Sequence, residues 1–135
     1  LEKHVSEGTT VLDIGCGSGI LSIAALLLGA ERAVGVDIDA LAVKTAIENG
    51  KVNGFEAPKY NILNGNLVDK VTGIFDVVVA NIVADIIILF SSQVGEFLKD
   101  VIKEGSELSV VFAYFTIFAY YGLHEQLDSI KRKIG

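Results

Sequence analysis

The chain has 135 residues, is 51% hydrophobic, carries a net charge of −6 at pH 7 and contains one proline and one cysteine. This length and apolar content suit one domain with a substantial core and argue against a disordered chain. One cysteine excludes an internal disulfide or a metal site of several thiolates, while the acidic surplus disfavours nucleic-acid phosphates and suits a cationic cofactor and a basic protein substrate.

Apolar strands and helical segments alternate along the chain. The predicted strands are Thr10–Ile14, Ala33–Asp37, Tyr60–Leu63, Phe75–Ala80 and a stretch within Glu107–Phe115. The predicted helices are Gly19–Leu28, Asp39–Asn53 and about Asp85–Lys103. Strands and helices that alternate at this spacing predict an α/β fold, with a mostly parallel sheet, right-handed crossovers and helices on both faces.

The helical spacing of apolar residues predicts which sides of the second and third helices are buried. The second helix is expected to pack on the sheet through Ala42, Ala46, Ile47 and Gly50. The third helix is expected to bury Phe90, Val94, Phe97, Leu98 and Val101. Each helix therefore presents one apolar side to the sheet.

A glycine-rich turn follows the first predicted strand, in the run Asp13-Ile14-Gly15-Cys16-Gly17-Ser18-Gly19. Alternate glycines let a ligand approach the backbone, and Asp37 at the end of the next strand is placed to bind both hydroxyls of a ribose. The run indicates a nucleoside-containing cofactor, and a tight turn without a ligand is the simpler alternative. A dinucleotide site expects glycine where this chain has Ile20, so the spacing disfavours NAD-type cofactors. Cys16 is interpreted as a small filler of the turn rather than a nucleophile.

Polar residues also follow the ends of the first four predicted strands. They are Asp13 with the glycines, Asp37, Asn64–Leu67 and Asn81–Asp85. Open parallel sheets bind ligands beyond the carboxyl ends of their strands, where the strand order reverses. These residues therefore predict an active site at that edge, with the plain alternatives that Asn81 is a turn residue and Asp85 a helix N-cap.

These motifs resemble a known family. The pattern Asp-x-Gly-x-Gly-x-Gly is similar to the first motif of S-adenosylmethionine-dependent methyltransferases with a Rossmann-like fold. From Leu1 to about Lys103, the chain resembles the catalytic domain of the bacterial ribosomal-protein methyltransferases that modify lysines of the large-subunit stalk-base protein. The matching segments are Val11–Ala25, Gly35–Asp39, Glu48–Asn49, Asn53–Gly54 and Val79–Asp85. In the last segment, Asn81-Ile82-Val83-Ala84 stands in the place of the Asn-Pro-Pro motif of many amino-directed methyltransferases.

The resemblance implies a cytoplasmic enzyme with S-adenosyl-L-methionine as its cofactor and a ribosomal protein as its partner. Residues 1–135 are then a Rossmann-like methyltransferase catalytic domain. It would transfer methyl groups to lysine side chains or the N-terminus by in-line displacement, with the amine oriented by Asn81. Two alternatives stay open: a methyltransferase for another amine, on a small molecule or a nucleobase, and an inactive cofactor-binding fragment.

The resemblance also implies the site residues, none of which is expected to hold a metal. The cofactor-binding residues are Asp13, Gly15, Cys16, Gly17, Asp37, Ile38, Asn66, Leu67 and Asn81. Asp13 would lie near the ammonium group of the methionine part, Asp37 at the ribose and Ile38 against the adenine. Asn66 would meet the adenine edge, where relatives often carry aspartate, and Asn81 is the expected catalytic residue.

The last quarter departs from the family pattern. One glycine, Gly105, stands where relatives have a Gly-Gly turn, and an aromatic-rich run follows from Phe112 to Tyr121. The family's last strands, the segment that closes over the cofactor and the substrate-recognition domain are not recognisable, so the domain is expected to be truncated at both ends. An open sheet edge would favour a homodimer. No membrane span is expected, because the apolar stretch Leu108–Leu123 is too short, and no direct nucleic-acid binding is expected.

Overall fold

The structure is a computed structural model that describes residues 1–66, 70–82, 96–112 and 132, with the backbone alone described at 81, 82 and 107–112. Its strands are β1 (Thr10–Ile14), β2 (Arg32–Asp37), β3 (Tyr60–Asn64), β4 (Phe75–Ile82) and β5 (Ile102–Phe112). Its helices are α1 (Ile20–Leu27) and α2 (Ala40–Val52), and residues 96–101 are also helical. Strands and helices alternate as the sequence predicts.

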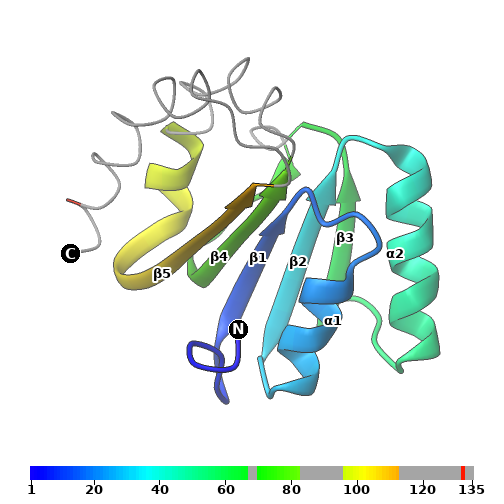
Figure 1. Cartoon of the computed structure of the whole chain (residues 1–135), viewed down its shortest axis with the longest axis horizontal. Helices are drawn as coiled ribbons and strands as arrows, with labels where there is room; N and C mark the ends of the chain where they lie inside the picture. The colour runs from blue at the N-terminus through cyan, green and yellow to red at the C-terminus, as the bar shows by residue number, and fades with distance from the viewer. Residues whose placement is uncertain (67–69, 83–95, 113–131, 133–135) are drawn as a thin grey trace.

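The five strands form one sheet in the order β3-β2-β1-β4-β5, and each neighbouring pair is parallel (Figure 1). The chain builds the sheet outward from β1 to β3 and then returns to the other side of β1 with β4. The strand order therefore reverses between β1 and β4, and folds of this kind bind ligands at the carboxyl ends of such strands. The predicted α/β class and parallel sheet are confirmed.

The core lies on both faces of the sheet. Along β1, Val11 belongs to one buried cluster and Leu12 to the other, because side chains alternate along a strand. The first cluster includes Ala25 of α1 and Ala46 of α2. The side chains that residues 96–101 add to the second cluster are Phe97, Leu98 and Val101. Helices thus cover both faces, and no helix in the described ranges is both long and apolar enough to cross a membrane.

The buried side of α2 differs from the predicted one. Ala46 and Gly50 are buried as predicted, but Val43 is buried without having been predicted, Ala42 is only partly buried, and Ile47 keeps 39% of its surface exposed. Val43, Ala46 and Gly50 follow one another at i, i+3 and i+7, so they define the buried side and Ile47 lies at its edge. A β-carbon at Gly50 would collide with the ring of Tyr60 of β3, so the helix needs glycine at this contact. The prediction that Ile47 belongs to the packed side is wrong.

Two boundaries also differ from the predictions. β4 continues to Ile82, so the backbone of Asn81 belongs to the strand and not to a turn. The third helix, predicted to reach Lys103, ends before Ile102, which starts β5 and pairs with Phe75. Strand pairing thus overrides the helical pattern at this point. The predicted parts of the third helix at 85–95 and of the fifth strand at 113–115 lie outside the described residues.

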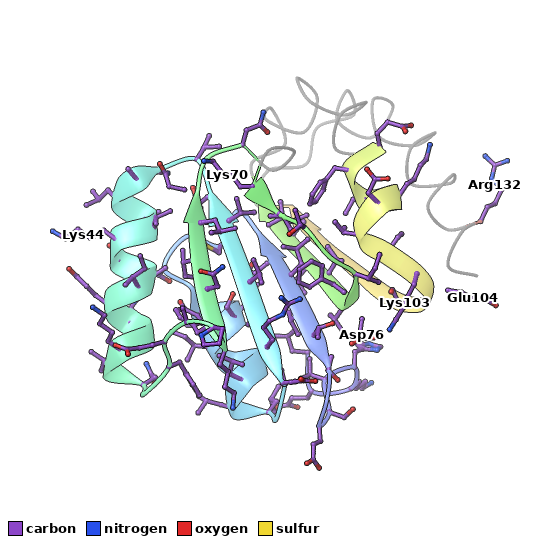
Figure 2. All side chains as sticks on the ribbon, turned by 180° about the vertical axis from the view of Figure 1, so that it is seen from behind. Lys44, Lys70, Asp76, Lys103, Glu104 and Arg132 are labelled. Carbon is purple, nitrogen blue, oxygen red and sulfur yellow. The ribbon has the colours of Figure 1, made fainter. Side chains whose placement is uncertain are left out.

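A polar cluster joins β1, β4 and β5 at the amino end of the sheet (Figure 2). Asp76 Oδ2 accepts hydrogen bonds from the backbone N–H and the hydroxyl of Thr10, both at 2.9 Å. Lys103 Nζ lies 2.7 Å from Asp76 Oδ1, and the two labelled side chains lie next to each other in Figure 2. The Lys103 contact is the largest cause that lowers the pKa of Asp76, and the bonds from Thr10 add to it. The cluster supports the fold at the end opposite the glycine turn.

We expect Asp76→Ala to lower the free energy of unfolding by about 2 kcal/mol at pH 7, because it removes charge-assisted hydrogen bonds at a partly exposed site. A carboxyl whose pKa is lowered by folding stabilises the fold above its ordinary pKa and loses that contribution as the pH falls through the folded-state value. The difference from wild type should therefore shrink below the ordinary value of 3.8. Urea denaturation at pH 7 and at acid pH measures it. The exposed Asp100 provides the control, and an Asp100→Ala loss as large as that of Asp76→Ala would contradict a special role for the cluster.

Candidate active site

Backbone hydrogen bonds hold the turn between β1 and α1 to the end of β2. The N–H groups of Gly15 and Cys16 donate to the carbonyl oxygen of Val36 at 2.8 and 3.1 Å. Gly15, Gly17 and Gly19 have φ angles of 69°, 53° and 78°, a region that favours glycine. A β-carbon added at Gly17 would meet no atom within 4 Å. The glycines therefore allow the path of the turn, and the backbone at Gly17 is open to a ligand.

Asp37 at the end of β2 connects three neighbouring segments of this edge. Its Oδ2 accepts the Gly17 N–H and its Oδ1 the Asp39 N–H, both at 2.9 Å. Its carbonyl oxygen accepts the Gly65 N–H at 3.0 Å and Asn64 Nδ2 at 3.1 Å, both from the end of β3. One residue thus fixes the glycine turn, the start of α2 and the segment after β3 relative to one another. Asp39 is the N-cap of α2, as predicted.

Asp13 lies beneath the same turn and has only 1% of its surface exposed. The hydroxyl of Ser22 donates to Asp13 Oδ2 at 2.8 Å, whereas Asp13 Oδ1 has no hydrogen-bond partner among the described residues. Burial raises the pKa of Asp13 to about 6, against the lowering effect of the Ser22 hydrogen bonds, and the charge of Asp37 adds to the rise. A buried carboxylate oxygen without a partner is costly, and a cationic group would satisfy it.

Cys16 fills the space beneath the turn. A β-carbon at Gly35 would lie 3.0 Å from Cys16 Sγ, so the buried thiol packs directly on β2. Burial, with the charges of Asp13 and Asp37, raises the pKa of the Cys16 thiol to about 12. A thiol that stays protonated at neutral pH is a poor nucleophile. This supports the interpretation of Cys16 as a filler.

The other predicted site residues lie at the same edge, as far as the structure describes them. Ile38 directly follows β2 and keeps 65% of its surface exposed. Asn66 is exposed two residues beyond β3. Asn81 follows the β4 residue that pairs with Ile14, so its backbone reaches the level of the glycine turn. Leu67 lies outside the described residues, and only the backbone of Asn81 is described.

Two polar side chains support this site through contacts that the sequence pattern does not predict. They are Ser22 and Asn49. Asn64 belongs to the predicted segment Asn64–Leu67, and its side chain donates to the carbonyl oxygen of Asp37. The role of Ser22 could have been inferred from the sequence, because Ser22 is the one polar residue of the otherwise apolar α1. Asn49 lies in the segment Glu48–Asn49 that matches the family pattern, but its contact with Ser18, 31 residues away, could not be read from the sequence. In the described part of the chain, no group of three or more His, Cys, Asp or Glu side chains could hold a metal ion.

Gly19→Ala should lower the free energy of unfolding by about 3 kcal/mol, because a backbone penalty and a steric penalty add. Gly19 has a φ of 78°, and a β-carbon there would collide with the Tyr60 hydroxyl and approach Ala46. Gly17→Ala is the matched control: its φ is also positive, but its β-carbon would meet no neighbour. It should cost only about 1 kcal/mol. Urea denaturation measures both, and equal losses would contradict close packing at Gly19.

A parallel sheet in this order, a glycine turn after β1 and a carboxylate at the end of β2 define a Rossmann-like methyltransferase domain. Solved structures agree with this class. A ribosomal protein L11 methylase from Lactobacillus delbrueckii subsp. bulgaricus superposes with a TM-score of 0.74 and 31% identity, covering 96% of this chain and 63% of that one. An RNA methyltransferase from Salinibacter ruber in complex with S-adenosyl-L-homocysteine has a TM-score of 0.66 and 25% identity, covering 80% and 68%.

The chain belongs to the ribosomal protein L11 methyltransferase (PrmA) family, whose family model matches residues 1–106. The ribosomal protein L11 methyltransferase of Clostridium botulinum is 50% identical over 135 residues, which are 99% of this chain and 38% of that relative. This chain thus spans less than two fifths of the relative's length. The family model ends at residue 106, close to Lys103, where the resemblance was expected to end, whereas the alignment with the C. botulinum relative continues over nearly the whole chain.

Proposed function

We propose that this chain binds S-adenosyl-L-methionine and forms the catalytic part of an enzyme that methylates amino groups of ribosomal protein L11. The observation that carries the proposal is the position of Asp37. Its carboxylate lies at the carboxyl end of β2 and accepts the Gly17 N–H, so a ribose bound there would lie beside the glycine turn. Methyl transfer and a ribosomal acceptor are supported by membership of the family.

Three features of the site fit this cofactor. A carboxylate has about four acceptor positions, and the hydrogen bonds from the Gly17 and Asp39 N–H groups use two of those of Asp37, which leaves room for two ribose hydroxyls. The open space beside Gly17 would admit the methionine part. The ammonium group of that part would be a partner for the buried Asp13 Oδ1. The further proposed contacts are Gly15, Cys16, Ile38, Asn66, Leu67 and Asn81.

When bound, the cofactor would supply an electrophilic methyl group on a sulfonium: the bond from the methyl carbon to the nitrogen of a neutral amine would form as the bond to sulfur breaks, and S-adenosylhomocysteine would leave. Asn81 is the proposed catalytic residue: its side-chain oxygen and a nearby backbone carbonyl would accept the amine hydrogens and aim the lone pair at the methyl carbon. Lysine has an ordinary pKa of about 10.4, so neutralising it at pH 7 costs roughly 4–5 kcal/mol. Desolvation beside a cationic centre lowers that cost. Orientation by Asn81 then removes the need for a strong general base.

The proposed partner is the stalk-base protein of the large ribosomal subunit. A ribosomal substrate would place the enzyme in the cytoplasm, and the net charge of −6 disfavours direct nucleic-acid binding. A homodimer through an open sheet edge stays a prediction, which sedimentation velocity of the 135-residue chain would test.

Calorimetric titration with S-adenosylhomocysteine, beside NADH, tests the cofactor. We expect the first ligand to bind and the second not to bind, and binding of NADH alone would contradict the proposal. Transfer of a labelled methyl group to purified L11, free lysine and nucleosides tests the acceptor. Transfer to lysine or a nucleoside but not to L11 would support another amine methyltransferase. Binding without any transfer would support a cofactor-binding piece that is inactive by itself.

A further inference from the structure

We infer that Asn49 of α2 is a positioning residue, which holds the glycine turn in the shape in which Gly17 meets Asp37. The inference rests on the proposed function, because the contact between Gly17 and Asp37 is what would present the carboxylate to a ribose. Asn49 lies on α2 and is outside the set of proposed cofactor contacts. Asn49 would therefore affect cofactor binding through the shape of the turn.

The turn is held at two successive residues by two different elements. The Gly17 N–H donates to Asp37 Oδ2 of β2 at 2.9 Å. The carbonyl oxygen of the next residue, Ser18, accepts a hydrogen bond from Asn49 Nδ2 of α2 at 3.0 Å. Both contacts involve the backbone of the turn, so together they fix its path from the side of β2 and from the side of α2.

Small residues allow α2 to come this close to the turn. A β-carbon at Gly19 would approach Ala46 Cβ to 3.1 Å, so the two segments touch there. The Tyr60 hydroxyl donates to the Ala46 carbonyl oxygen at 2.9 Å, and the Tyr60 ring packs against Gly50. Burial raises the pKa of Tyr60, which keeps the hydroxyl protonated as a donor. Tyr60 therefore fixes α2, and α2 in turn fixes Asn49 beside the turn.

Loss of the Asn49 amide would leave the Ser18 carbonyl to water. The flanking residues, Gly17 and Gly19, have the greatest backbone freedom of any residue type, so the peptide groups between them could rotate. The turn would then spend time in shapes in which Gly17 does not donate to Asp37, and the apparent affinity falls with the fraction of competent molecules. Loss of one neutral hydrogen bond corresponds to a weakening of about 3- to 10-fold.

The test is Asn49→Ala in this chain, with Asn53→Ala as the matched control. Asn53 lies at the end of the same helix and its Nδ2 donates to the Asn49 carbonyl oxygen at 2.8 Å, so the control removes an asparagine amide without touching the turn. For Asn49→Ala, the Kd of S-adenosylhomocysteine should rise about 3- to 10-fold. The amide proton resonance of Gly17 in the ligand-free chain should move upfield, as its hydrogen bond to Asp37 weakens. For Asn53→Ala, both readouts should stay close to wild type.

A second variant separates the hydrogen bond from packing. Asn49→Asp keeps the shape of the side chain but replaces the donor with an acceptor, so it should shift the Gly17 resonance in the same direction. An unchanged Gly17 resonance in both Asn49 variants would overturn the inference, and so would a lower Tm with an unchanged Kd. The resonance is measured without ligand. Failure of the wild-type chain to bind S-adenosylhomocysteine would therefore contradict the proposed function and leave this test of Asn49 valid.

Discussion

Asp37→Asn should weaken the binding of S-adenosylhomocysteine by about 100-fold or more, because two hydrogen bonds from ribose hydroxyls to a charged group would be impaired. The new amide also directs N–H groups toward the region of the Gly17 and Asp39 N–H groups, which now donate to the carboxylate. The chain should stay folded, since the carbonyl oxygen of residue 37 keeps its bonds from Asn64 and Gly65. Calorimetric titration measures the loss.

Asp100→Asn makes the same chemical change at an exposed carboxyl of the helical residues before β5. Its affinity for S-adenosylhomocysteine should equal that of wild type. Urea denaturation of both variants separates lost binding from lost folding. If Asp37→Asn bound the ligand as tightly as this control, the ribose would not lie at Asp37, and the proposed placement of the cofactor would be wrong.

The second large effect concerns the stability of Asp13→Asn at different pH values. Burial raises the pKa of Asp13 from 3.8 to about 6, so folding takes up a proton between these values and the ionised side chain destabilises the fold at higher pH. Asparagine is neutral throughout. The free energy of unfolding of the variant, relative to wild type, should therefore rise by about 2 kcal/mol between pH 4 and pH 7. Urea denaturation across this range measures the rise.

The ligand preference of Asp13→Asn tests the proposed partner of Asp13 Oδ1. S-adenosylhomocysteine carries an ammonium group, whereas 5′-methylthioadenosine does not. The variant should bind the first ligand about 10-fold more weakly or worse, and the second as wild type does. Equal losses for the two ligands would contradict the ammonium contact. A stability difference that does not change with pH would contradict the raised pKa.

The architecture could be predicted from the sequence for those elements whose structure depends on their own residue pattern. The apolar runs of β1, β2 and β4 are buried on both faces, and such runs between helical segments are typical of a parallel sheet. The predictions failed where contacts with residues far along the chain determine the structure. Ile102 leaves the helix because it pairs with Phe75, and the buried side of α2 runs through Val43, Ala46 and Gly50, where the Tyr60 ring packs, and leaves Ile47 at its edge.

The same distinction applies to the site. Asp13 and Asp37 could be expected at one edge, because each lies at or near the end of a strand in a parallel sheet. Two features could not be predicted: the Oδ1 of Asp13, which has no partner in the part of the chain that the structure describes, and the contact of Asn49 with Ser18. Both depend on how α1 and α2 pack. These features need the positions of atoms from segments that are far apart in the chain. The roles of Leu67 and of the Asn81 side chain stay predictions.

The single cysteine of the chain, Cys16, lies buried beneath the glycine turn, so the reactivity of its thiol reports on motion of the turn. The buried thiol of Cys16 can meet an alkylating reagent only while the turn is lifted from it, as an amide exchanges its hydrogen only while its hydrogen bond is open. The rate of alkylation therefore measures how often the turn opens. A ligand lying along the turn would slow alkylation in proportion to its occupancy. Mass spectrometry of the alkylated chain could then follow both opening and occupancy at this one thiol.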